Sequence, residues 1–351
     1  MGVLLILLIA LGGGALLVRE QQGSQKPAGG GALGQPLLKG LQASQVAAIV
    51  IRQPRDAITI AKKGERWTIA ERGGFPADFD KVREFVVKAI ALKIGQSEPI
   101  GEKDRARLLL DASGTAIEFL GADGKPLARL TAGKKYFKTE PEDAEKANGD
   151  GRYVVLPGDE KQVLVIADSL AQASTRSADW ISKAGFAAEK VKTMEVRAAD
   201  GASWKIERPG DNADWKLAGA RGDEKLDISR ANAASYSLSL IELADVAPAD
   251  AKPEQTGLDK PLVVTATTLD GLTYTLKLGR PSGDNYYATI AIAGEPRPEG
   301  KDAEERLKKI SERLPREKAL ADYTLLVPKS KLEDIIKKRS DLLAKKEEKK
   351  K

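Results

Sequence analysis

Short segments in which apolar and polar residues alternate run along most of the chain, and clusters of Gly, Asp and Asn separate them. Alternation with a period of two is the pattern of a strand with one buried face, and short polar clusters between such strands are typical of hairpin turns. We therefore predict antiparallel meanders. Their strands cover residues 46–52, 57–61, 67–69, 191–197, 202–206 and 215–217.

These strands form two series, so the chain carries a long internal repeat. Residues 46–52 correspond to 191–197, and Trp67 and Trp215 occupy the same place in the third strand of each series. Matched positions lie about 145 residues apart at the start of the copies and about 160 residues apart at their end. A charged insertion, 294–322, accounts for the difference, and its pattern predicts a helix around residues 303–313.

Each series leads into a predicted amphipathic helix. Asp78 and Asp227 stand where an N-cap side chain accepts the first free N–H groups of a helix. We expect the first helix to end at Gly95, and the apolar face of the second to extend from Ile228 to Ile241.

Both copies continue and end in the same way. A hairpin is predicted around Asp123-Gly124 in the first copy and around Asp270-Gly271 in the second. The last strand of each copy, within residues 163–170 and 324–332, is expected to lead into a helix.

Together the elements predict an α+β fold of two tandem, internally duplicated lobes, each an antiparallel sheet with helices, behind one N-terminal transmembrane helix. A ligand or partner would bind most naturally in a cleft between two such lobes. The predicted divisions are a transmembrane anchor (1–18), a flexible linker (19–40), a first lobe (41–185), a second lobe (186–340) and a charged tail (341–351).

The anchor is predicted from an uncharged apolar run at residues 2–18. As a helix it would span roughly 26 Å, slightly less than a hydrocarbon core of about 30 Å. A cleaved signal peptide is the alternative, although a basic leading region and a clear cleavage site are lacking. The orientation stays open, because Arg19 and Lys26 follow the run and the positive-inside rule would place the bulk of the chain in the cytoplasm.

The formal charge of +6 does not indicate a nucleic-acid binder. Residues 329–351 hold 10 Lys and Arg against 5 Asp and Glu, so this tail alone carries +5. The rest of the chain is nearly neutral and has no basic stripe interleaved with aromatic residues. We therefore expect no nucleic-acid partner.

The composition also argues against catalysis. The chain has no histidine, the commonest general base near neutral pH, and no cysteine, so thiolate chemistry and cysteine zinc sites are excluded. Motifs of serine hydrolases and phosphate-binding loops are absent. We expect no enzyme activity, no cofactor and no metal site.

One group of residues resembles a ligand or partner surface. Asp284, Asn285, Tyr286 and Tyr287 combine polar and aromatic side chains at the end of a predicted hairpin, and Trp180 lies near the junction of the copies. Packing at the start of a strand is the structural alternative for the first four.

Several segments together resemble a known family. They are the Trp-containing strand, the Asp-started helix, residues 256–261 (Thr-Gly-Leu-Asp-Lys-Pro), the hairpin closing on Leu278-Gly279, and residues 177–183. The chain, over roughly residues 40–340, resembles the bacterial family called domain of unknown function 4340. The second copy contains a Gly-Leu-x-x-Pro turn at residues 257–261, and in the first copy Arg107-Leu-Leu-Leu-Asp111 stands in its place.

The resemblance implies a function without naming catalytic residues. Members of this family are similar to the extracytoplasmic accessory component of gliding-type ABC transporters. The resemblance thus implies a non-catalytic subunit in the inner membrane, anchored through residues 2–18, with a periplasmic body and an ABC permease or related envelope protein as partner. An independent envelope protein that binds glycan or peptide in the inter-lobe cleft is the alternative.

Overall fold

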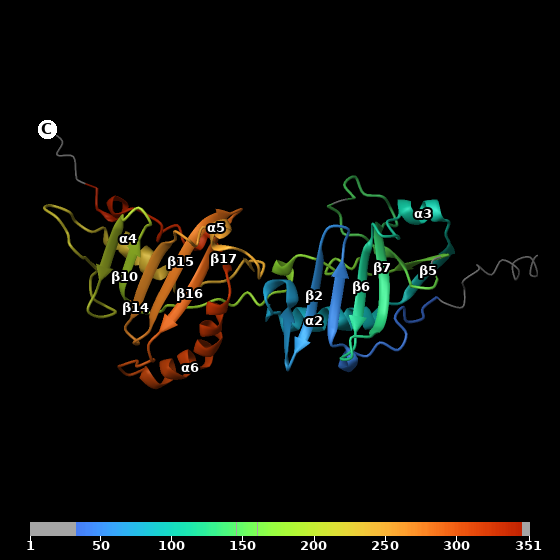
Figure 1. Cartoon of the computed structure of the whole chain (residues 1–351), viewed down its shortest axis with the longest axis horizontal. Coiled ribbons are helices and arrows are strands. Elements are labelled where there is room, and N and C mark those ends of the chain that lie inside the picture. Colours follow the sequence, from blue (N-terminus) through green and yellow to red (C-terminus); the bar gives the residue numbers. More distant parts are fainter. Residues whose placement is uncertain (1–32, 145, 160, 346–351) are drawn as a thin grey trace, which may run out of the picture. The chain divides into compact units, whose positions relative to one another are not determined.

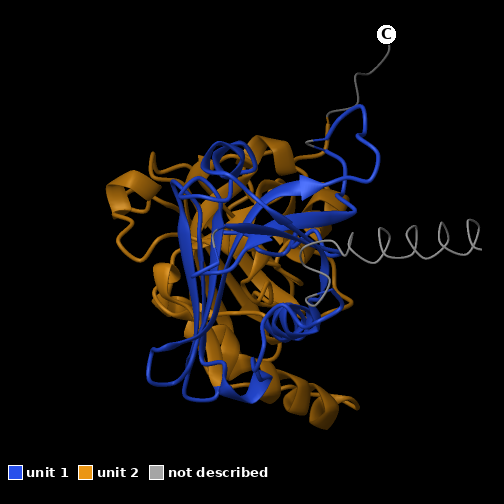
Figure 2. Ribbon diagram, turned by 90° about the vertical axis from the view of Figure 1, so that its right-hand side faces the viewer, with its two compact units in different colours: residues 1–65, 80–175 blue, residues 66–79, 176–351 orange. Residues whose placement is uncertain are grey.

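The computed structural model describes residues 33–144, 146–159 and 161–345 of the chain. Contacts divide it into two compact units, one containing residues 80–175 and the chain up to residue 65, the other containing residues 66–79 and 176 onward (Figure 2). The predicted anchor at 1–18, most of the predicted linker and the end of the charged tail lie outside the described residues. Within the described residues, no helix is both long and apolar enough to cross a bilayer.

The first unit is an antiparallel sheet with helix α2 (Phe79–Ala91) lying across one face (Figure 1). Phe85 of the helix stacks on Phe119 of the sheet with ring centroids 5.9 Å apart, and both rings are buried. The strands follow the order β2-β1-β6-β7-β8-β9-β5. Their bounds, with the short helix α3, are β1 (Ala48–Arg52), β2 (Ala57–Lys63), β5 (Ile94–Pro99), α3 (Glu102–Arg107), β6 (Thr115–Leu120), β7 (Pro126–Tyr136), β8 (Gly151–Val155) and β9 (Gln162–Ile166).

The second unit is built on an antiparallel sheet of corresponding order, β12-β11-β10-β14-β15-β16-β17-β13. It also contains the short pair β3 (Arg66–Ile69) and β4 (Phe75–Pro76). The other elements are β10 (Val191–Arg197), β11 (Ser203–Glu207), β12 (Lys216–Leu217), α4 (Ile228–Tyr236), β13 (Asp245–Val246), α5 (Pro253–Thr256), β14 (Leu262–Thr268), β15 (Thr273–Ser282), β16 (Asn285–Ala293), α6 (Ala303–Ala319) and β17 (Leu325–Pro328).

The two sheets correspond strand for strand. The order β11-β10-β14-β15-β16-β17-β13 in the second unit matches β2-β1-β6-β7-β8-β9-β5 in the first. Helix α4 occupies the place of α2 in the chain order, and α5 that of α3. The predicted fold class, with α and β elements and two antiparallel sheets, is confirmed.

The helix predictions need several corrections. Helix α2 ends at Ala91, and Gly95 lies within β5. Helix α4 ends at Tyr236, before Leu238 and Ile241, although the predicted cap is present: the Asp227 carboxylate accepts hydrogen bonds from the N–H groups of Ser229 and Arg230. The helix predicted around 303–313 is confirmed and extends to Ala319.

No helix follows β9, so the prediction of a helix after the last strand of the first copy was wrong. The Asp168 carboxylate accepts a hydrogen bond from the Leu170 N–H at 2.6 Å, and Leu170 has a φ of 51°. A left-handed residue within such a turn is incompatible with a continuing α-helix. Directly after β17 the chain makes a short 3₁₀ turn, Lys329–Lys331.

Residues 34–38 belong to the folded first unit, whereas the sequence pattern placed them in a flexible linker. Leu37 and Leu38 are buried. The Leu37 N–H donates to the Leu92 carbonyl at 2.8 Å, and the Gly34 N–H donates to the Ile94 carbonyl at 2.8 Å. Two adjacent leucines in a Gly- and Gln-rich stretch are the signal for this packing, because burying apolar side chains offsets the cost of ordering the backbone.

Helix α6 has no counterpart among the described residues of the first unit, and it buries a carboxylate against the second sheet. Glu317 is 1% exposed. It accepts hydrogen bonds from the Ala187 N–H at 3.2 Å and from the Tyr274 hydroxyl at 3.4 Å. Arg313 Nε lies 3.6 Å from it. Burial is the main cause that raises the pKa of Glu317, and burial likewise raises the pKa of the Tyr274 hydroxyl.

Candidate functional site

Trp180, which the sequence indicated as a ligand or partner residue, is buried. It follows the 3₁₀ turn Ser177–Asp179 (η3), and only 2% of the residue is exposed. Its carbonyl oxygen accepts a hydrogen bond from the Asp78 N–H at 2.7 Å. The indole therefore contributes to the core of the second unit and presents no surface to a ligand.

The other four predicted residues lie together where β15 turns into β16. Asp284 is exposed, and its carbonyl oxygen accepts a hydrogen bond from the Lys329 N–H at 2.9 Å. Tyr286 and Tyr287 are half-buried and pair with Val327 and Leu326 of β17. Consecutive residues of a strand face opposite sides of the sheet, so the two tyrosine rings do not form one surface.

Asn285 completes the group and also belongs to the sheet. It pairs with Ser282 of β15 and with Pro328 of β17. The Lys329 ammonium lies 5.9 Å from the centre of the Tyr286 ring, within the range of a cation–π contact. The positions of these residues accord with packing at the start of a strand.

The tryptophans offer little aromatic surface for stacking a sugar. Trp215 is 3% exposed, donates its indole N–H to Asn232 at 3.0 Å, and lies 4.7 Å from the Arg208 guanidinium. Trp204 is also buried, while Trp67 is half-buried. Trp215 therefore fills the core of the second unit, whereas Trp67 is only partly covered.

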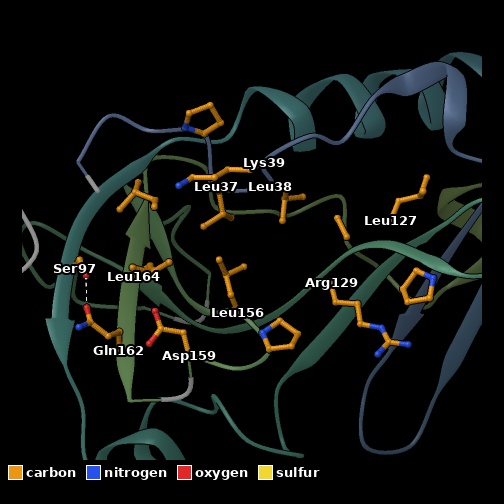
Figure 3. Close-up of a pocket in the computed structure, with 15 residues that line it drawn as sticks. Leu37, Leu38, Lys39, Ser97, Leu127, Arg129, Leu156, Asp159, Gln162 and Leu164 are labelled. Atoms are coloured by element: carbon orange, nitrogen blue, oxygen red, sulfur yellow. Dashed lines mark hydrogen bonds between the residues drawn. The ribbon is translucent and has the colours of Figure 1, made fainter. Parts of the chain in front are cut away.

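A cavity of about 750 Å³ in the first unit is the better candidate for a binding site (Figure 3). Its volume is within the range of ligand sites in proteins. Residues of three segments line it: residues 36–39, the β8–β9 connection and the sheet itself. Figure 3 shows Leu37, Leu156 and Leu164 gathered on one side, with Leu127 and Arg129 across from them.

The cavity follows the edge of strand β7. Pro126, Leu127, Ala128 and Arg129 all line it, although consecutive side chains of a strand point to opposite faces. Four consecutive lining residues therefore place the cavity beside the backbone of β7. Sequence reasoning missed these residues because a single strand pattern does not reveal which stretch of its edge lacks a neighbour.

The polar groups around this cavity are mostly partnered. Arg129 pairs with Glu118 at 3.3 Å, and Arg52 pairs with the same carboxylate at 3.1 Å. Ser97 donates its hydroxyl hydrogen to the Gln162 side-chain oxygen at 2.7 Å, as the dashed line in Figure 3 marks.

The described lining residues form no catalytic pair. Ser97 has an amide oxygen as its partner, which is too weak a base to activate a hydroxyl nucleophile. Lys39 and Asp159 add one exposed charge of each sign at the rim. A cavity lined mainly by apolar residues, with several polar and charged side chains among them, is suited to binding.

A second cavity of about 760 Å³ in the first unit has a more cationic lining. It contains Arg107, Lys134 and Lys135 beside Phe137 and Tyr153. Arg107 pairs with Asp104 at 3.1 Å, and Lys135 donates to the Ala147 carbonyl at 2.7 Å. Two of its three cations are thus engaged by the protein itself, so the cavity along β7 is the stronger candidate.

The structure holds no cluster of metal-ligating side chains within its described residues. Among protein families, the sequence model of the family described as Domain of unknown function (DUF4340) matches residues 67–261, more than half of the chain. The chain belongs to this family.

The DUF4340 match begins in β3, covers the first unit from α2 to β9, and continues into the second unit as far as the residue before β14. It therefore includes β7, β8 and the cavity-lining residues from Ile94 to Leu164. No curated protein and no solved structure matched the chain.

Proposed function

We propose that this DUF4340 protein is a non-catalytic accessory subunit of a gliding-type ABC transport system, anchored in the inner membrane with its two lobes outside the cytoplasm. The observation that carries the proposal is the cavity along β7, a binding feature whose described lining residues form no catalytic pair. The apolar run at residues 2–18 supports the membrane anchor, and the absence of histidine and cysteine supports a role in binding.

The second candidate, an independent envelope protein, divides into glycan and peptide binding. Glycan sites usually present aromatic faces, and Trp180, Trp204 and Trp215 are buried. Peptide binding fits the strand edge in the cavity better, and it is also the chemistry that a protein partner would use. The predicted site in a cleft between the lobes stays a prediction.

Co-purification tests the subunit assignment. The full chain, tagged after Lys351 and extracted in mild detergent with and without a membrane-permeable crosslinker, is expected to recover the permease of the transport system. An unrelated single-pass membrane protein with the same tag is the control. Recovery of the chain alone in several detergents and with crosslinkers of different lengths would contradict the assignment.

A further inference from the structure

The two sheets differ at the strand next to the central hairpin. Strand β15 pairs with β16 from Ser282 back to Thr273, so its whole length is covered. Strand β7 extends from Tyr136 back to Pro126, but among the described residues β8 pairs with it only from Thr131 onward. Residues 126–130 of β7 thus have β6 on one side and, within the described part of the chain, no strand on the other.

Equivalent positions follow from the pairing register. In the first sheet Ile49, Phe119 and Ala128 form one row across three strands. In the second sheet Met194, Ala266 and Tyr274 form the corresponding row, and this row continues to Ile292 of β16.

The next inward-facing row of the second sheet continues in the same way from Leu276 to Ile290. Residues 290–293, with the sequence Ile-Ala-Ile-Ala, therefore fill in the second unit the place that is open in the first.

The cause of the difference lies in the chain after β8. At Leu156 and Pro157 the chain leaves the sheet and closes a turn in which the Asp159 N–H donates to the Leu156 carbonyl at 3.2 Å. Proline has no N–H and does not extend a central strand. In the second unit β16 continues through Ala293, and α6 follows.

The side chain at the open row is also smaller. Tyr274, which is 1% exposed, fills its row in the second unit, while the equivalent residue of the first unit is Ala128. This difference leaves room beside β7 for a larger side chain from an added strand. Leu127, on the neighbouring position, is 36% exposed.

We propose that the edge of β7 at residues 126–130 binds an extended segment of the partner protein as an added antiparallel strand with large apolar residues at alternate positions. This rests on the proposed function and names the chemistry of its partner. The backbone of the added strand supplies hydrogen bonds, and its apolar side chains fill the cavity. The strand 290–293 shows the pattern that the site accepts, with room for an aromatic residue opposite Ala128.

A labelled peptide of residues 287–294 (Tyr-Ala-Thr-Ile-Ala-Ile-Ala-Gly) is the probe. Its binding to the purified full chain is measured by fluorescence polarisation. Two analogues carry N-methyl groups either at the residues equivalent to Ile290 and Ile292 or at those equivalent to Ala291 and Ala293. Alternate amides of a strand point to opposite edges, so one analogue should bind as the parent does and the other should bind at least tenfold more weakly.

Leu127→Lys places a charge on the edge and is expected to weaken binding of the parent peptide at least tenfold. Val87→Lys, at an exposed position of α2 outside the cavity, should leave binding unchanged. Amide hydrogen exchange provides the independent readout, because bound peptide should slow exchange within residues 127–130.

Three results would overturn the proposal: no saturable binding, equal binding of both N-methylated analogues, or protection only outside residues 127–130. If the permease co-purifies and the peptide does not bind, the docking mode is wrong and the subunit assignment is unaffected. If the peptide binds and no permease is recovered, the edge is a peptide site and the subunit assignment fails.

Discussion

Gly133→Ala is expected to destabilise the first unit by about 3 kcal/mol, and Gly279→Ala to destabilise the second by a similar amount. A Cβ atom at Gly133 would lie 2.2 Å from the Leu108 carbonyl oxygen, and one at Gly279 would lie 2.1 Å from the Thr256 carbonyl oxygen. Both oxygens belong to the backbone just at the end of α3 and α5, so neither can rotate away. Neither glycine has a positive φ, and the cost arises from the added atom itself.

Urea unfolding of the purified chain, monitored with a probe in each unit, tests this prediction. Gly210→Ala is the matched control, because a Cβ at this position meets no atom within 4 Å and its φ is not positive. The control should stay within about 0.5 kcal/mol of the wild type. Equal stability of all three variants would mean that the matched close approach of helix end and sheet is absent from the protein.

Glu317→Ala is expected to cost about 3 kcal/mol at pH 7, since it removes a buried side chain and leaves the Ala187 N–H and the Tyr274 hydroxyl without their acceptor. Glu317→Gln keeps the shape and an acceptor oxygen, so it should cost less. The three proteins can be compared by thermal and urea unfolding.

The pH dependence gives this prediction a sign. Burial raises the pKa of Glu317 above its ordinary value of 4.5, so the folded protein binds a proton more tightly than the unfolded chain. The stabilisation that comes from this tighter proton binding by Glu317 is complete below pH 4.5, and it is lost as the pH rises through the folded-state pKa of Glu317. Relative to wild type, Glu317→Gln should therefore become more stable as the pH rises from 4.5.

Glu312→Gln, at an exposed position of the same helix, controls for the loss of one negative charge. If wild type and Glu317→Gln change in parallel from about pH 4 to about pH 8, the buried carboxylate does not titrate as described and the packing of α6 on the second sheet has to be revised.

The sequence was sufficient for the meanders and hairpins, because each strand alternates apolar and polar residues and turns at Asp-Gly or Asn-rich clusters. The Asp227 cap and the helix in the insertion were also predictable from local signals. The helix expected after β9 was wrong, because one Asp side chain and a left-handed Leu170 ended the strand in a turn. Such a turn depends on a single residue and leaves no periodic pattern.

The candidate site was less accessible from sequence. Tyr286 and Tyr287 are adjacent aromatic residues in the sequence, yet the strand places their rings on opposite faces of the sheet. The cavity arises from the course of the chain after β8. The one local signal is Pro157, because the second copy continues at this point with an unbroken run of strand-forming residues.

Membrane topology tests the central claim, that the two lobes act outside the cytoplasm, most directly. Two reporters are fused after Lys351, an enzyme active only outside the cytoplasm and a fluorescent protein that matures only inside it. The proposed function predicts activity of the first and no signal from the second. A fluorescent cytoplasmic fusion with an inactive enzyme fusion would contradict it, and the assignment as an extracytoplasmic subunit would have to be abandoned.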